Sequence, residues 1–255
     1  MTEAERRAAL DAIGAEVAAC TRCRLHEART KAVPGEGTAA TEVIFVGEGP
    51  GFNEDRQGRP FVGQAGALLS ELLGSVGWSR EEVFITNVVK CRPPENRDPE
   101  PDEIAACGPF LTRQLVALDP ALVVTLGRFS MARFNPGARI GQVHGTFRPS
   151  APESGAPEAL TYAMYHPAAA LHQGSLKATL FQDMEGVPLA LLEARKLRSV
   201  APVPLGTAGL LGETAHAPAV SEAAEPFATP GPSNAAAESA GAFAESGPTD
   251  QLSLF

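Results

Sequence analysis

The chain is poor in cysteine, in aromatic residues and in long apolar segments. Its 255 residues include four cysteines, one tryptophan and two tyrosines. No apolar run is long enough to span a bilayer, so no membrane segment is predicted. Residues 1–20 form a charged, alanine-rich helical pattern without the apolar stretch of a secretory signal, so we expect a cytoplasmic location with reduced thiols.

Lysine and arginine are absent beyond Arg198. The net charge of the whole chain is −9, which disfavours a polyanionic partner. Six of the 30 acids lie in the region that has no Lys or Arg, however, which leaves 24 acids against 21 Lys and Arg in residues 1–198. That domain has a net charge of only −3, and a nearly neutral domain can bind nucleic acid through a local basic surface.

Residues 199–250 are rich in Ala, Pro, Gly, Ser and Glu and have few large apolar side chains. Such a segment cannot bury enough surface to offset its backbone entropy, so we expect a disordered acidic linker. Residues 1–198 have the composition of one globular domain, which we expect to be monomeric.

Strand and helix patterns alternate along residues 1–198. Short apolar or β-branched runs, typical of buried parallel strands, occupy residues 43–47, 83–87, 121–127 and 160–165. Helical patterns occupy residues 1–19, 64–76, 102–117, 129–134 and 175–197, the last with Ser175 as a candidate N-cap, while residues 138–149 suggest an extra hairpin or loop. This alternation predicts a three-layer α/β/α fold with a central, mostly parallel four-stranded sheet.

Polar residues follow the four predicted strands. Gly47-Glu48-Gly49 ends the first strand, Asn87 ends the second, Gly127 and Arg128 follow the third, and His166 follows the fourth. Ligands of open α/β sheets bind beyond the carboxyl ends of the strands, so a carboxylate, an amide and an imidazole are expected to converge there.

Each of these residues also has an ordinary structural explanation. Glu48 could be solvated in a glycine turn, and Asn87, which offers a donor and an acceptor to an amide-like edge, could cap local backbone. His166 could be a satisfied structural histidine rather than a donor to a charged oxygen. Phe61 could be a core residue rather than a stacking platform for a flat ring.

The four cysteines are Cys20 and Cys23, in a Cys-x-x-Cys pair, and Cys91 and Cys107. In a reducing compartment such a quartet indicates a closed four-thiolate metal site before it indicates disulfides. The basic residues Lys90, Arg92 and Arg97 lie around the loop from Cys91 to Cys107, where they could contact phosphate or be neutralised by acids of the same loop.

These segments together resemble the family 4 uracil-DNA glycosylases, the class that carries a 4Fe–4S cluster. The resemblance covers about residues 10–197 and includes the order and spacing of the cysteines. The matching segments are 47–51 with Glu54 and Asp55, 58–63, 86–94 and 166–171.

The resemblance implies an enzyme that hydrolyses the N-glycosidic bond of deoxyuridine in DNA. It implies a structural 4Fe–4S cluster on the four cysteines and a uracil pocket formed by Gly47, Glu48, Gly49, Phe61, Asn87 and His166. His166 would stabilise charge on the base, and Glu48 would activate water, with Glu54 as a rival.

The DNA contacts implied are Lys90, Arg92, Arg97 and, at the end of the last motif, His172. No basic loop insertion carrying a trapping histidine is present, so turnover without a covalent intermediate is expected.

The chain ends in Gln251-Leu252-Ser253-Leu254-Phe255, which resembles the pentapeptide that docks bacterial proteins onto the replicative sliding clamp. Gln251, Leu252, Leu254 and Phe255 would occupy a preformed groove. A flexible tether of about 50 residues has an r.m.s. reach of about 40 Å. A chance apolar end is the alternative.

Two other functions stay open from the sequence. One is a non-catalytic, clamp-tethered DNA-binding module with an iron–sulfur or zinc site. The other is a four-thiolate zinc enzyme of different nucleotide chemistry. The colour of the purified protein separates the zinc enzyme, which would be colourless, from the brown iron–sulfur glycosylase. Release of uracil separates the glycosylase from the non-catalytic module.

Overall fold

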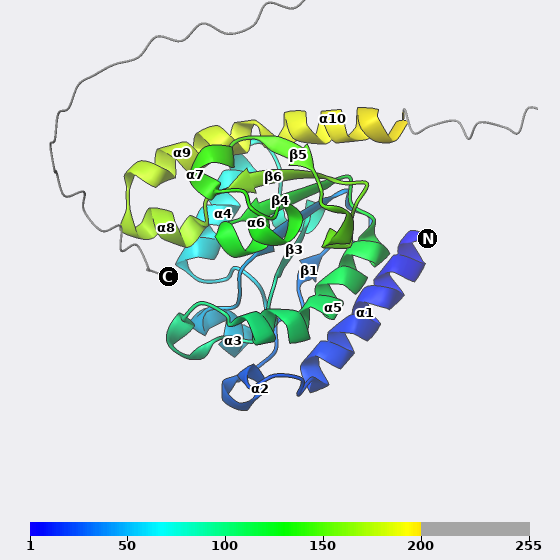
Figure 1. Ribbon diagram of the computed structural model, residues 1–255, viewed down its shortest axis with the longest axis vertical. Helices are drawn as coiled ribbons and strands as arrows, with labels where there is room; N and C mark the ends of the chain where they lie inside the picture. Colours follow the sequence, from blue (N-terminus) through cyan, green and yellow to red (C-terminus); the bar gives the residue numbers. More distant parts are fainter. Residues whose placement is uncertain (200–255) are drawn as a thin grey trace, which may run out of the picture. The chain divides into compact units, whose positions relative to one another are not determined.

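The computed structural model describes residues 1–199. The predicted linker 199–250, beyond its first residue, and the terminal peptide 251–255 lie outside the described residues. Figure 1 shows a sheet covered by helices on both faces, which is the predicted three-layer α/β/α arrangement. No described helix is long and apolar enough to cross a membrane.

The sheet has six strands in the order β1-β3-β2-β4-β6-β5. The four predicted strands form its parallel centre, and the two edge strands pair antiparallel. The bounds are Glu36–Gly37 (β1), Val43–Gly47 (β2), Phe84–Asn87 (β3), Leu122–Leu126 (β4), Phe147–Pro149 (β5) and Leu160–Met164 (β6). The prediction of four strands therefore missed two short edge strands. β1 has two residues, and all three residues of β5 are exposed.

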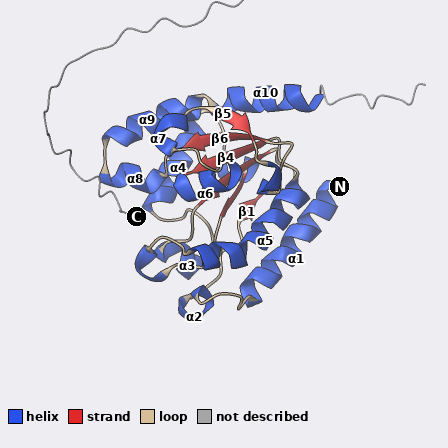
Figure 2. Ribbon diagram, in the orientation of Figure 1, coloured by secondary structure: helices blue, strands red, loops and turns tan. Residues whose placement is uncertain are grey.

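The helices lie around this sheet as Figure 2 shows. Their bounds are Glu3–Ala19 (α1), Leu25–Ala28 (α2), Phe52–Gln57 (α3), Gln64–Ser75 (α4), Pro101–Leu118 (α5), Arg128–Phe134 (α6), Ile140–Val143 (α7), Pro167–His172 (α8), Ser175–Glu185 (α9) and Val187–Ser199 (α10). The prediction of a single helix over 175–197 is wrong, because the helix is interrupted at Gly186. The N-cap of α9 is Gly174 and not Ser175, which is the first residue of the helix.

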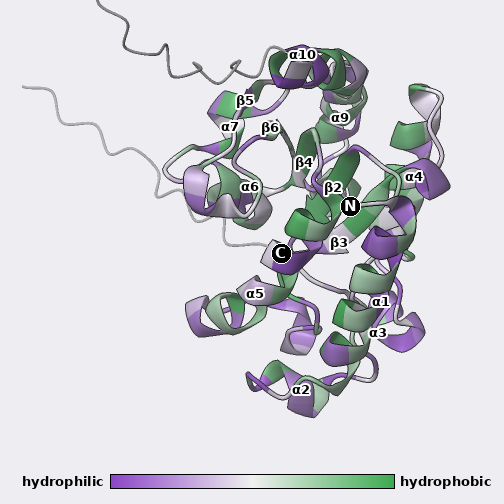
Figure 3. Ribbon diagram, turned by 90° about the vertical axis from the view of Figure 1, so that its right-hand side faces the viewer, coloured by the Kyte–Doolittle hydropathy of each residue, from purple (hydrophilic) through white to green (hydrophobic). Residues whose placement is uncertain are grey.

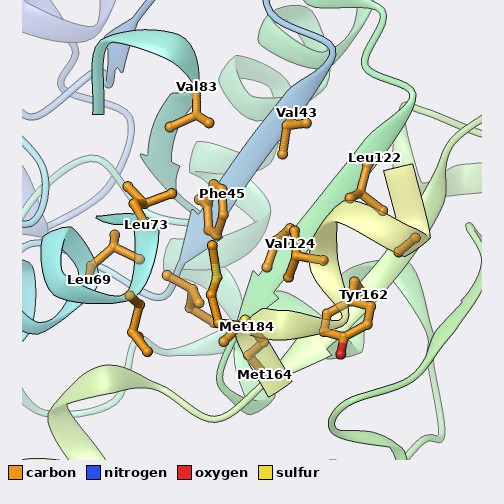
Figure 4. Close-up of a cluster of buried hydrophobic side chains, with 14 of the residues drawn as sticks. Val43, Phe45, Leu69, Leu73, Val83, Leu122, Val124, Tyr162, Met164 and Met184 are labelled. Atoms are coloured by element: carbon orange, nitrogen blue, oxygen red, sulfur yellow. The ribbon is translucent and has the colours of Figure 1, made fainter. Parts of the chain in front are cut away.

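Alternate residues of the central strands point to opposite faces of the sheet. Val43 and Phe45 of β2 pack against α4, α9 and α10, whereas Ile44 and Val46 pack against α1 and α5. Figure 4 shows the first of these two cores, with Phe45 near Leu69 and Leu73 of α4. The central strands β2 and β4 are mostly hydrophobic in Figure 3, as expected for strands buried on both faces.

The topology also fixes where a ligand can bind. The chain passes from β2 to β3 on one side and then returns to β4 on the other side of β2. Ligands of such sheets bind at this switch point, beyond the carboxyl ends of the strands. Gly47 pairs with Asn87 at the end of β2 and β3, so the glycine turn and the amide share one edge.

Candidate active site

Gly47 lies at the centre of the site. A Cβ atom on this residue would lie 2.6 Å from Cζ of Phe61 and closer still to Oδ1 of Asn87. The missing side chain therefore lets the amide and the aromatic ring approach the end of β2. Even the smallest side chain at position 47 would displace one of them.

Asn87 is buried, with 1 % of its surface exposed, and neither atom of its side-chain amide has a partner among the described residues. Leaving a buried polar atom unpaired costs about 1–3 kcal/mol, so native proteins rarely do it without a reason. The Asn87 backbone carbonyl accepts a hydrogen bond from Lys90 Nζ at 2.7 Å, which holds the residue in place. The amide thus presents an unpaired donor and an unpaired acceptor to a ligand.

Phe61 adopts a left-handed backbone conformation, with φ of 51°, and its ring is buried. Arg80 Nη1 donates to the Phe61 carbonyl at 2.9 Å, and Glu54 Oε1 accepts hydrogen bonds from the next two backbone amides, those of Val62 and Gly63, each at 2.8 Å. These contacts hold a conformation that costs about 1–3 kcal/mol in a non-glycine residue. They fix the ring beside Gly47.

The His166 ring lies 5.6 Å from the Phe61 ring, centroid to centroid, with an angle of 29° between the planes. His166 is the N-cap of α8, and its Nδ1 accepts a hydrogen bond from the Ala168 amide at 3.1 Å. That contact assigns the proton of the neutral ring to Nε2. Burial lowers the pKa of His166 to about 4, so the ring is a neutral Nε2–H donor near pH 7.

Glu48 and Glu54 are the two carboxylates next to this pocket. Burial, assisted by the negative charge of Asp98 and opposed by Arg128, raises the pKa of Glu48 to about 7. A group with such a pKa can accept a proton near neutral pH. The Glu54 carboxylate is instead engaged by the Phe61 loop, which makes Glu48 the better candidate for a general base.

The four cysteines gather around one cavity, although they come from distant parts of the sequence. Cys20 is the C-cap of α1, Cys23 precedes α2, Cys91 lies four residues beyond Asn87, and Cys107 is in α5. No disulfide joins any of these four cysteines.

Two donors point at these sulfurs. Arg29 Nη1 lies 3.1 Å from Cys91 Sγ, and the Lys90 amide lies 3.2 Å from Cys107 Sγ. Four sulfur ligands with N–H donors around them suit a cysteine-ligated cluster. Within residues 1–199, no three His, Cys, Asp or Glu side chains have the spacing of a single-ion site.

Lys90 was predicted to contact DNA, and the structure contradicts this. The side chain is 1 % exposed, and its Nζ donates to Thr86 Oγ1 at 2.6 Å, to Gln114 Oε1 at 2.7 Å and to the Asn87 carbonyl. Three acceptors match the three protons of an ammonium group, so the site is satisfied internally. Lys90 links β3 to α5 and cannot reach a phosphate.

The other predicted DNA contacts differ in how available they are. Arg97 forms a two-point ion pair with buried Glu103 and, through its hydrogen bonds, holds the pKa of Glu103 at about 2. Arg92 is partly exposed and hydrogen-bonded to Asn96, and His172 is exposed at the end of α8. Arg92 and His172 are therefore accessible to a ligand, and the charge of Arg97 is already paired.

Sequence reasoning did not find Arg80, which supports the Phe61 loop. Its guanidinium also bonds the Pro60 carbonyl at 2.8 Å and pairs with Glu36 of β1. Nothing near Arg80 in the sequence indicates this role, because its partners lie 19 to 44 residues away.

The sequence profile of the uracil-DNA glycosylase superfamily matches residues 34–185, which include the glycine turn, Phe61, Asn87 and His166. The chain is 47 % identical over 188 residues to the type-4 uracil-DNA glycosylase of Saccharolobus solfataricus, covering 71 % of this chain and 86 % of the relative. It is 43 % identical over 187 residues to the corresponding protein of Archaeoglobus fulgidus, covering 70 % and 91 %. The chain belongs to the type-4 uracil-DNA glycosylases.

Proposed function

We propose that this chain is a DNA-repair enzyme that hydrolyses the N-glycosidic bond of deoxyuridine and releases uracil. The observation that carries the proposal is the buried Asn87 amide, which has no partner among the described residues and lies beside Gly47 and Phe61. Uracil has an acceptor, O4, next to a donor, N3–H, and this pair complements the Nδ2 and Oδ1 atoms of Asn87. A pocket built around an unpaired amide rejects bases that cannot satisfy it.

The chemistry follows from the placement of the neighbouring groups. The target nucleotide must leave the base stack, because C1′ is inaccessible inside a duplex. As the C1′–N1 bond breaks, the sugar becomes positive and the departing uracil negative. A neutral His166 donates Nε2–H to uracil O2, and each such donor is worth about 3–4 kcal/mol in a transition state.

Glu48 accepts the proton of the attacking water, and Gly49 contributes backbone to the same turn. The water oxygen bonds to C1′, uracil leaves with the bonding electrons and then takes a proton, and an abasic site remains. No protein nucleophile takes part, so the enzyme is monofunctional.

We assign the cofactor as a 4Fe–4S cluster held by Cys20, Cys23, Cys91 and Cys107. When bound, the cluster supplies a structural crosslink between the N-terminal helix, the segment after β3 and α5. The sulfur-only donor set and the N–H groups of Lys90 and Arg29 suit such a cluster, and the absence of single-ion spacing among residues 1–199 favours it over zinc.

Uracil release from a deoxyuridine-containing single strand tests the proposed activity. Release separates the enzyme from a non-catalytic DNA-binding module. A colourless protein that contains zinc would instead favour the zinc alternative, because an iron–sulfur protein is brown.

Glu48 predicts the pH dependence of the reaction. Its carboxylate forms only as the pH rises through about 7, so kcat/KM should increase across that range and level off above it. The His166 pKa of about 4 places its titration below this range. Glu48→Gln should lower the rate by about 10²-fold or more and remove the rise.

Rates measured from pH 5 to pH 9 for both proteins check this. Glu54→Gln is the matched variant, and it should change KM or stability while keeping the rise near pH 7. A Glu48→Gln profile that retains the rise would assign the base elsewhere.

We also propose that residues 251–255, which lie outside the described part of the chain, dock onto a sliding clamp. The support is the sequence Gln-Leu-Ser-Leu-Phe after a segment of linker composition, which would hold the enzyme near DNA at the nucleoid.

Deletion of residues 251–255 should abolish clamp pull-down while leaving uracil release from short oligonucleotides unchanged. Ser253→Ala, which removes no anchor side chain, should retain clamp binding. Equal pull-down by the deleted and full-length chains would refute the docking role.

A further inference from the structure

Phe52 is an exposed aromatic residue at the start of α3, with 51 % of its surface open. Two guanidinium groups lie over its ring, that of Arg92 at 5.2 Å and that of Arg56 at 5.5 Å from the ring centroid. We call these three residues the Phe52 platform. Neither Phe52 nor Arg56 has a place in the pocket described above.

The two arginines keep their charge available. Arg24, Arg97 and Arg128 each form an ion pair with a described acid. In contrast, neither Arg56 nor Arg92 forms one with any described residue. Arg92 is oriented by a neutral contact, since its Nε donates to Asn96 Oδ1 at 2.7 Å. The platform therefore combines an open aromatic ring with two unneutralised positive charges.

The platform also lies next to the pocket. Phe52 follows the glycine turn that ends β2, and a Cβ on Gly49 of that turn would lie 3.7 Å from Pro93, the residue after Arg92. Two residues beyond Phe52, Glu54 holds the loop that carries Phe61. The platform is thus connected to two segments that form the pocket, the glycine turn and the Phe61 loop.

We infer that the Phe52 platform binds the nucleotide adjacent to the flipped uracil, with that base stacked on the ring or a guanidinium plane and its phosphates contacted by Arg56 and Arg92. This inference rests on the proposed function. Aromatic rings and arginine planes are the surfaces on which proteins stack unpaired bases, independently of sequence. Positive charge beside the ring matches the phosphates on either side of the base.

Phe52→Ala tests the stacking. Affinity for a deoxyuridine-containing single strand should fall about 10-fold, measured by fluorescence anisotropy. Phe147→Ala is the matched control, because Phe147 is 46 % exposed on the edge strand β5 and should leave affinity unchanged. Phe52→Trp, which keeps a stacking ring, should retain binding.

A second arm identifies the partner of the ring. Two oligonucleotides are compared, one lacking the base on the 5′ side of the uracil and one lacking the base on the 3′ side. One of the two should bind the unaltered enzyme as weakly as Phe52→Ala binds the complete strand. For that oligonucleotide, Phe52→Ala should cause no further loss of affinity. If Phe52→Ala loses affinity equally with and without either neighbouring base, or loses none, the inference is wrong.

Arg56→Gln tests the charge. The slope of log affinity against log salt should become shallower by about 0.7, the value for one phosphate contact on a single strand. An unchanged slope would contradict the phosphate contact. Binding measured by anisotropy does not depend on turnover. If the Phe52 and Arg56 variants lose affinity as expected but the unaltered protein releases no uracil, the proposed activity is refuted and the binding role of the Phe52 platform is not.

Discussion

Replacing Asn87 by alanine should lower uracil release by about 10²–10³-fold while leaving the domain at least as stable as before. The loss of activity follows because the substitution removes both groups that pair with the edge of uracil. The stability follows because the folded protein buries an amide with no described partner, and alanine removes that cost. Single-turnover uracil release and thermal unfolding measure the two effects separately.

Asn135 offers a matched control with the opposite signature. Its Nδ2 donates to the Pro149 carbonyl at 3.1 Å, and its Oδ1 accepts from Thr161 at 2.7 Å. Asn135→Ala should therefore destabilise the fold, by about 1–3 kcal/mol for the broken contacts, and leave the rate unchanged. If Asn87→Ala behaved like Asn135→Ala, Asn87 would be a structural residue and the pocket would need another recognition group.

Replacing Cys107 by alanine should remove the brown colour and lower the melting temperature strongly. Cys107 is buried in α5 and faces the cavity that the other three cysteines also line. Loss of a structural metal group is among the few single changes that cost more than about 4 kcal/mol. Visible absorption, iron content and the unfolding temperature measure the effect.

The same change should also reduce activity, although Cys107 does not touch the substrate. Cys91 lies four residues beyond Asn87, and Lys90 between them ties the Asn87 carbonyl to Gln114 of α5. Loosening the cysteine site therefore disturbs the segment that positions the amide. A Cys107→Ala protein that kept its colour, melting temperature and rate would refute the structural role of the cluster.

The four central strands could be predicted because the residue pattern of a buried strand lies within the strand itself. The mostly apolar runs of β2 and β4, each with five buried residues, match the pattern of a buried parallel strand whatever surrounds them. The edge strand β1, with two residues, has no pattern of its own and depends on pairing with β3. The break between α9 and α10 does have a sequence signal, Gly186 followed two residues later by Pro188, and the prediction of one continuous helix did not take it into account.

Several residues that meet at the candidate site could be predicted from the sequence, but whether their polar groups are hydrogen-bonded could not. Strand-end arguments bring Gly47, Asn87 and His166 to one edge, yet no sequence pattern tells whether an asparagine is satisfied. Lys90 illustrates the opposite error. Between Asn87 and Arg92 it resembles part of a basic surface, and only the tertiary arrangement shows that its ammonium group points inward to three acceptors.

A crystal structure of the cluster-loaded protein with uracil bound tests the central claim most directly. The account predicts that Asn87 Oδ1 accepts from uracil N3–H and Nδ2 donates to O4, that the ring contacts Phe61, and that His166 Nε2 faces O2. Uracil bound elsewhere, or bound with the Asn87 amide still unpaired, would contradict it.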